Sequence, residues 1–255
     1  MLRQIIYPAV FLLLAGAAFS QSRLPPGNII PVRLDTSLSS AKSKVGERVS
    51  ARVMQDVPLG RGEILRSGSE VLGHVLEADS ASRNGQGKIA VRFDRVRWAK
   101  KSRRLPVVLS LRAIASFMDV EEAQIPLFGA DRGTAEEAYT TEQVGGDVVY
   151  RGGGPVRMGS ETVGTPAENG VLSRMTSNPD LGCRGAVAGN GRPQALWVFS
   201  SAACGAYGLP NIRIAHAGRG DPKGEILFVS ERGNLHIPAG SGLLLRVGTV
   251  ARATP

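Results

Sequence analysis

Cysteine, histidine and aromatic residues are scarce in this sequence, and their scarcity excludes several classes of site. The chain has 2 cysteines and 3 histidines in 255 residues, and Phe, Trp and Tyr together make up 5%. His74, His216 and His236 do not cluster at the spacing of a zinc site, so we expect no metal. Trp98 is the sole candidate for stacking against nucleic-acid bases, and one ring does not make a platform. Nucleic acid is therefore not an expected partner.

The sequence also lacks the motifs of common catalytic sites. Ser69 and Ser241 each follow a glycine, but neither stands in the glycine-x-serine-x-glycine elbow of hydrolases. The glycines at 152–154 are not followed by the lysine and serine or threonine of a phosphate-binding loop. His216, with Asp221 to orient it, is a candidate general base without an identified nucleophile. We predict a protein without catalytic residues or cofactors; an exported hydrolase acting on an envelope polymer is the alternative.

Residues 1–20 have the pattern of a secretory signal peptide. Arg3 gives a positive start, Ile5–Ala18 gives an apolar run of 14 residues, and Ala18-Phe19-Ser20 gives a small-x-small cleavage site. The run is shorter than the ~20 residues of a membrane-spanning helix, and no later run approaches that length. We expect cleavage after Ser20, no transmembrane helix in the mature chain, and a periplasmic or outer-membrane-associated protein. An uncleaved anchor is the alternative.

Both cysteines fall in the part of the chain that would be exported. Oxidation is permitted there, so we predict a disulfide between Cys183 and Cys204. By restricting the unfolded chain, such a loop would stabilise the fold by roughly 3 kcal/mol. Two buried thiols are the alternative.

Charge divides the mature chain into three segments, which we take as its domain organisation. Residues 21–115 hold 18 basic and 8 acidic residues, residues 116–175 hold 4 and 10, and residues 176–255 hold 8 and 4. An acidic middle segment thus interrupts two basic flanks. The formal net charge of +9 permits anionic partners without identifying one.

The first flank has the two-residue period of β-strands. After Phe93 the apolar positions shift to Val96 and Trp98, as a β-bulge or a sharp bend would require. Residues 82–87 are rich in Gly and Asn and predict a turn, which makes 71–98 a hairpin. Alternation of apolar and polar residues is found in three runs, 49–54, 71–76 and 89–94.

Further strands are predicted on both sides of the middle segment. Residues 105–114 place Val107, Leu109, Leu111 and Ala113 on one face. The second flank has short apolar runs separated by Gly and Pro, at 195–199, 212–214, 225–230 and 243–247.

The middle segment, 116–175, has no sustained period. It holds Gly145-Gly146 and the glycines at 152–154, so we predict a loop-rich insertion with one short helix around Thr134–Tyr139. A loop of this length is unusual in a compact domain. A functional excursion and a disordered segment both remain open. The predicted fold is therefore all-β, a mostly antiparallel β-barrel or sandwich closed by the N- and C-terminal flanks, with a loop-rich acidic insertion.

Four segments of the flanks carry short motifs that together suggest a family resemblance. Residues 27–40 contain Ile30-Pro31 and Leu34-Asp35-Thr36. The other three are 49–57, which ends in Asp56-Val57, then 64–73 with its Gly68-Ser69 pair, and the closing run 237–247. In this order they resemble the C-terminal β-barrel module of the scaffold subunit of type IV secretion and conjugal-transfer outer-membrane complexes, with 27–40 similar to its opening.

The resemblance implies a non-enzymatic structural or binding module of the cell envelope. Its partners would be envelope proteins or an anionic envelope polymer, and homo-oligomers are possible. Family members carry an amphipathic pair of helices that forms an outer-membrane pore, and 116–175 lacks such an apolar pair. Pore formation is therefore not expected.

The most basic stretch of the sequence is the candidate binding site. Its charges could meet anionic lipid headgroups, an acidic polymer or nucleic acid. Two alternatives remain open: a hairpin tip kept soluble by its charges, and a surface onto which the acidic insertion folds back. The candidate residues are Arg95, Arg97, Lys100, Lys101, Arg103 and Arg104.

Overall fold

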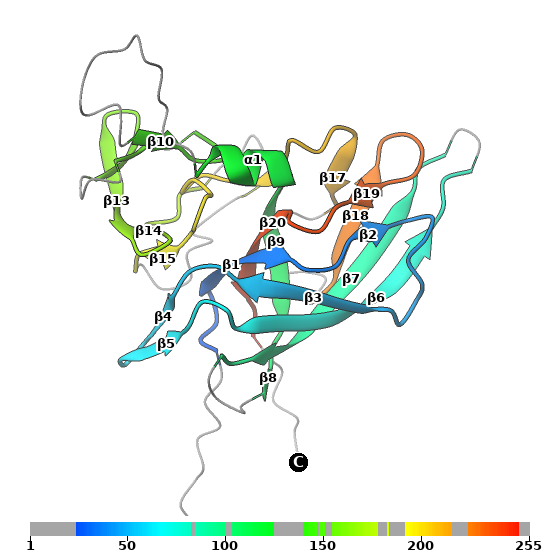
Figure 1. Ribbon diagram of the computed structural model, residues 1–255, viewed down its shortest axis with the longest axis horizontal. Coiled ribbons are helices and arrows are strands. Elements are labelled where there is room, and N and C mark those ends of the chain that lie inside the picture. The colour runs from blue at the N-terminus through cyan, green and yellow to red at the C-terminus, as the bar shows by residue number, and fades with distance from the viewer. Residues whose placement is uncertain are drawn as a thin grey trace, which may run out of the picture.

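The computed structural model describes residues 24–82, 85–99, 104–124, 140–146, 148–150, 155–177, 183, 192–215 and 224–249. Within them the chain forms a nearly closed barrel and a second, smaller sheet beside it, with one short helix above the junction (Figure 1).

The barrel is a ten-stranded sheet to which both flanks contribute. Nine strands follow the order β16-β9-β20-β1-β3-β6-β7-β18-β17, and β8 pairs with β7. The predicted closure by both flanks is confirmed. Among the described strands of this sheet the pairings are antiparallel, except that β16 runs parallel to β9. The strands are β1 (Ile29–Leu34), β3 (Arg48–Val53), β6 (Glu70–Asp79), β7 (Lys88–Arg97), β8 (Arg104–Pro106), β9 (Leu109–Ala115), β16 (Gly205–Tyr207), β17 (Ile212–Ile214), β18 (Ile226–Ser230) and β20 (Gly242–Val247).

Two small ladders accompany the barrel. β2 (Leu38–Ser39) pairs with β19 (His236–Ile237), and β4 (Val57–Gly60) pairs with β5 (Glu63–Leu65) as a projecting hairpin.

The long hairpin of β6 and β7 contains the predicted bulge. Leu72 pairs with Arg95 and Gly73 with Phe93, so Asp94 has no residue directly opposite. Because of this extra residue, Asp94 and Arg95 both face outward while Val96 returns to the core.

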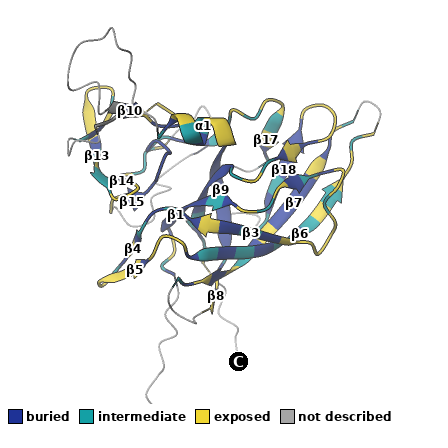
Figure 2. Ribbon diagram, viewed as in Figure 1, coloured by how far each residue is buried: buried dark blue, intermediate teal, exposed yellow. Residues whose placement is uncertain are grey.

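The barrel interior is a packed core. Apolar side chains of the alternating strands fill it, as is usual for barrels of this size, and the outer residues of β3 and β6 are more exposed (Figure 2). The largest fully buried apolar side chains include Phe93, Phe228, Leu34, Leu65, Ile89 and Leu109.

The described part of segment 116–175 adds strands that the sequence pattern did not predict. Together with β15 of the second flank they form a six-stranded sheet in the order β10-β11-β12-β13-β14-β15. Apart from β13, these strands have two to four residues and are too short to show a sustained period. The predicted helix at Thr134–Tyr139 lies outside the described residues. The elements are α1 (Phe117–Glu122), β10 (Thr140–Glu142), β11 (Val148–Tyr150), β12 (Val156–Met158), β13 (Glu161–Ala167), β14 (Gly170–Ser173) and β15 (Gln194–Ala195). In the described ranges, no helix is long and apolar enough to span a membrane.

Two expected strands are interrupted. The run 105–114 breaks at Val107 into β8 and β9. A register shift opposite Leu244/Leu245 leaves Arg112 as an extra residue in β9. Ala113 therefore packs in the core beside the small sheet, whereas Leu109 and Leu111 pack in the barrel core. The run 195–199 ends as a strand at Ala195, because Trp197 takes a left-handed conformation, φ 58°. Trp197 and Phe199 pack together in the core beside the small sheet.

Buried amides join the small sheet to the barrel. Gln55, which follows β3, accepts from the backbone N–H of Trp197 at 2.7 Å and of Val171 at 3.2 Å, and donates to the carbonyl of Val171 at 2.7 Å. Gln194 of β15 accepts from the backbone N–H of Ile29 at 3.0 Å. These bonds satisfy backbone groups that the strand ends would leave unpaired.

Candidate functional site: an arginine-rich face of the barrel

The structure places three of the six predicted binding residues on two neighbouring strands. Arg95 and Arg97 lie near the end of β7, and Arg104 opens β8. Lys100, Lys101 and Arg103 lie outside the described residues. Arg97 and Arg104 stand directly opposite each other across the β7–β8 ladder.

The antiparallel pairing extends this patch across four strands. Arg52 of β3 lies opposite Glu70 of β6, which lies opposite Arg97. In the same way Arg48 of β3 lies opposite His74 of β6, which lies opposite Arg92 of β7. The outer side of β3, β6, β7 and β8 is hereafter called the basic face, and its arginines are Arg48, Arg52, Arg92, Arg95, Arg97 and Arg104.

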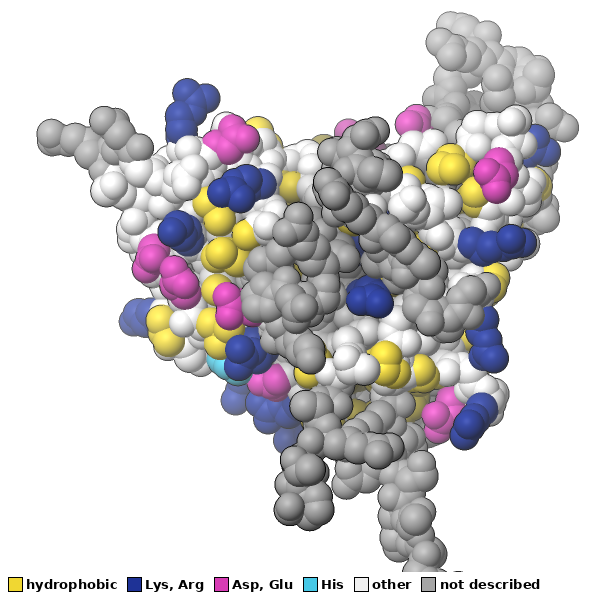
Figure 3. Space-filling view, turned by 180° about the vertical axis from the view of Figure 1, so that it is seen from behind, with side chains coloured by type: hydrophobic (Ala, Val, Ile, Leu, Met, Phe, Trp, Pro, Cys, Tyr) yellow, Lys and Arg dark blue, Asp and Glu magenta, His cyan; other side chains and the backbone are white. Residues whose placement is uncertain are grey.

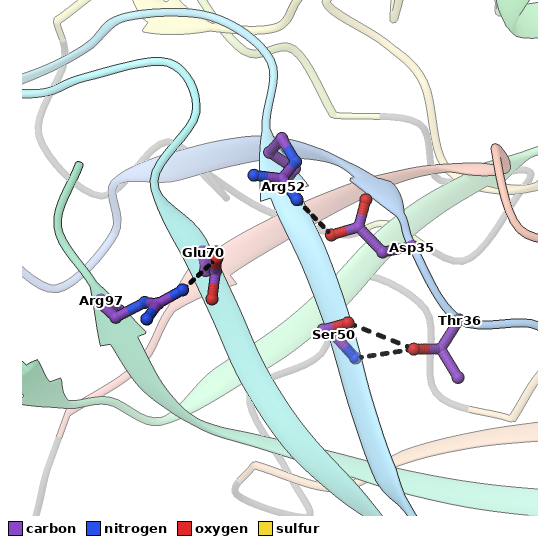
Figure 4. Close-up of polar contacts among 6 residues, drawn as sticks. All are labelled: Asp35, Thr36, Ser50, Arg52, Glu70 and Arg97. Carbon is purple, nitrogen blue, oxygen red and sulfur yellow. Dashed lines mark hydrogen bonds and ion pairs between the residues drawn. The ribbon is translucent and has the colours of Figure 1, made fainter.

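Three of these arginines have acidic partners. Arg97 pairs with Glu70, and Arg52 reaches Asp35 with 3.3 Å between Nη2 and Oδ2 (Figure 4). The third, Arg95, contacts Asp94 with 2.8 Å between Nε and Oδ1. Pairs exposed to this degree each contribute only about 0–1 kcal/mol to stability.

The bulge residue Asp94 is shared with a histidine. Its other oxygen, Oδ2, lies 3.1 Å from Nδ1 of His74. The carboxylate that the bulge turns outward therefore holds one arginine and one histidine of the basic face in place.

The other three arginines are free. Arg48, Arg92 and Arg104 make no ion pair or side-chain hydrogen bond with any described residue, and each is exposed. Like charges placed directly opposite on paired strands repel. Arg104 opposite Arg97 is therefore an arrangement that a bound anion would stabilise.

The basic face is hollowed into a groove of about 530 Å³. The polar side chains that line it come from all four strands, so the groove crosses the sheet. These are Arg48, Glu70, His74, Arg95, Arg97 and Arg104.

The acidic segment does not cover the basic face in the described part of the chain. The carboxylates that pair with its arginines are Asp35, Glu70 and Asp94, all from the first flank. Glu121 of α1 pairs elsewhere, with Arg33, at 2.7 Å. On the side of the molecule seen from behind, basic and acidic side chains lie interspersed (Figure 3).

Sequence reasoning missed Arg48 and Arg52, because they lie more than 40 residues before the basic stretch. Arg52 was in the predicted strand 49–54 and Arg48 lay just before it, but the neighbour of that strand in the sheet was not assigned. Pairing β3 with β6 would have brought them to the patch.

The predicted disulfide is confirmed. Cys183 and Cys204 are bonded, with 6.1 Å between their Cα atoms, and both are buried. The candidate base His216 and its partner Asp221 lie outside the described residues. Among the residues that are described, no group of three or more His, Cys, Asp or Glu side chains could hold a metal ion.

Compared with protein-family models, curated proteins and solved structures, the chain gives no match. The function is therefore inferred from the basic face and its surroundings.

Proposed function

We propose that this protein is a non-enzymatic, exported module of the cell envelope that binds an anionic envelope polymer through the basic face. The observation that carries the proposal is the set of six arginines across four paired strands, three of which have no ion-pair or hydrogen-bond partner among the described residues. Arginine suits this task because its planar guanidinium stays charged and donates in forks that match phosphate and carboxylate oxygens.

The location on the outside of the barrel favours a large partner. Apolar side chains occupy the barrel interior, whereas the basic face is a broad exposed strip of sheet. A polymer can lie along such a strip and contact several guanidiniums at once. The positive potential of the basic face would also raise the association rate with an anionic polymer at low salt.

Export supports the same reading. The signal-like segment 1–20 and the disulfide between Cys183 and Cys204 both fit an oxidising compartment outside the cytoplasm. Resemblance to a secretion-complex scaffold barrel points to the envelope as well.

The test measures binding of the protein to lipopolysaccharide and to teichoic acid, with neutral dextran as the control polymer. Replacing Arg48, Arg92 and Arg104 with Gln is expected to weaken binding to at least one anionic polymer by about tenfold or more. The matched control carries Gln at Arg157, Arg174 and Arg213, which are also exposed but lie away from the basic face. Binding should also weaken as salt is raised.

Equal losses in the two triple variants, or no binding to either anionic polymer, would refute the proposal. Protein isolated from the envelope fraction is expected to begin at Gln21. Recovery of the protein reduced and in the cytosol would contradict the exported part of the proposal.

A further inference from the structure

We infer that the groove on the basic face is a discrete site for a phosphate group carried on a compact polar headgroup, such as a phosphorylated sugar or glycerol. This deepens the proposed function and rests on it. The positive charge of the basic face as a whole would attract any polyanion. A discrete site in the groove would instead bind one kind of ligand with a fixed stoichiometry and a chemical preference.

The lining of the groove has an excess of positive charge. Four of its side chains are arginines, and one of them, Arg97, is matched by Glu70. Arg95 is held by Asp94, beside the groove. Arg48 and Arg104 have no ion-pair or hydrogen-bond partner among the described residues, so the groove has guanidinium donors that no described carboxylate uses.

The placement of the free arginines favours phosphate over carboxylate. Arg48 comes from β3 and Arg104 from β8, with β6 and β7 between them, so they line the groove from opposite sides. The two oxygens of a carboxylate lie in one plane and are satisfied by a single guanidinium fork. The tetrahedral oxygens of a phosphate can accept from more than one guanidinium, and Arg104 stands directly opposite Arg97 on the neighbouring strand.

The volume indicates that the phosphate is carried on something larger. A groove of about 530 Å³ lies within the range of about 300–1,000 Å³ that is typical of small-molecule sites. A bare phosphate would leave much of it empty. Glu70 and His74 also line the groove and offer polar atoms to the hydroxyl groups of a sugar or glycerol.

Two variants distinguish a discrete phosphate site in the groove from general electrostatic attraction to the basic face. Arg104 lines the groove, whereas Arg92 lies on the same face, is equally free, and does not line it. Binding of inorganic phosphate, glycerol 3-phosphate and glucose 6-phosphate would be measured by calorimetry, with glucuronate as the carboxylate comparison. Arg104→Gln and Arg48→Gln should each weaken binding of the phosphate esters about tenfold, and Arg92→Gln by less than about twofold.

The outcomes distinguish the inference from the proposed function. If the phosphate esters do not bind, or if Arg92→Gln and Arg104→Gln weaken them equally, the groove is not a site, although polymer binding by the basic face can still stand. Glucuronate binding as tightly as the phosphate esters would refute the preference for phosphate. Vesicles with phosphatidylglycerol, compared with free glycerol 3-phosphate, show whether the headgroup is taken from a lipid surface or from solution. Both results agree with the inference, provided that Arg104→Gln weakens the binding about tenfold.

Discussion

Arg112 is a charged residue that is fully buried, which is unusual for an arginine. It is the extra residue of the β9 bulge, fully buried, and its guanidinium donates to the carbonyls of Thr176 at 2.6 Å, Ala203 at 2.7 Å and Ser201 at 3.4 Å. Burial lowers its pKa to about 10, and it still carries its charge at neutral pH. Its role is to satisfy three carbonyls of the segments on either side of the disulfide-bonded Cys183.

Tyr207 lies near Arg112 and gives a pH-dependent prediction. Burial raises the pKa of Tyr207 above its ordinary value of about 10, although the N–H of Cys204, which donates to the hydroxyl at 3.0 Å, and the charge of Arg112 both lower it. The native state therefore holds this proton more tightly than the unfolded chain does. Its stabilising contribution is complete below pH 10 and is lost as the pH rises through the native pKa.

We expect Tyr207→Phe to have a lower free energy of unfolding than the unmodified protein by about 1 kcal/mol at pH 8, since the bond to Cys204 is lost. This difference should shrink between pH 10 and higher values. Urea unfolding of both proteins across this range measures it. A difference that stays constant with pH would show that the hydroxyl is not buried as described.

At the scale of elements, the bulge of β7 decides which side chains form the basic face. Gly73, opposite the bulge, is required there because a Cβ at this position would lie 2.0 Å from the carbonyl oxygen of Arg92. No side chain can be accommodated unless the two strands separate. The bulge and this glycine together place Asp94 and Arg95 on the outer surface.

Gly73→Ala is expected to destabilise the protein by about 1–3 kcal/mol, the usual cost of overpacking. The matched control is Gly248→Ala, whose new methyl group would meet no atom closer than 3.3 Å. Thermal unfolding measures both. Equal and small effects would mean that β6 and β7 are not held in the register described.

Most strands of the barrel and the bulge of β7 could be predicted from the sequence. Alternation located β3, β6 and β7, and the shift after Phe93 located the bulge, because one buried face imposes a strict two-residue period. The strands of the small sheet were missed, since three- and four-residue strands such as β12 and β14 are too short to show a period. The basic face was half predicted: Arg95, Arg97 and Arg104 are close in sequence, whereas Arg48 joins them only through pairing of β3 with β6.

On the scale of the whole molecule, the barrel and the small sheet have separate cores and share a buried junction. Ile29, Ala113 and Leu244 belong to barrel strands but pack in the core of the small sheet, because β1, β9 and β20 are covered on both sides. Gln55 and Arg112 add buried hydrogen bonds across the same junction. Separating the two sheets would expose these apolar side chains and leave the bonded backbone groups without partners.

The chain has 2 tryptophans, one in each core, which makes this cooperativity measurable. Trp98 packs in the barrel core and Trp197 in the core of the small sheet. Trp98→Phe leaves a fluorescence signal from the small sheet alone, and Trp197→Phe leaves one from the barrel alone. In each variant the fluorescence midpoint in urea should coincide with the midpoint from far-ultraviolet circular dichroism, as one cooperative transition requires. If Trp197 instead reports unfolding at lower urea than circular dichroism does, the small sheet melts first and the shared junction is too weak to couple the two cores.

Reducing the disulfide is expected to lower both midpoints together, because the loop it closes restricts the same unfolded chain.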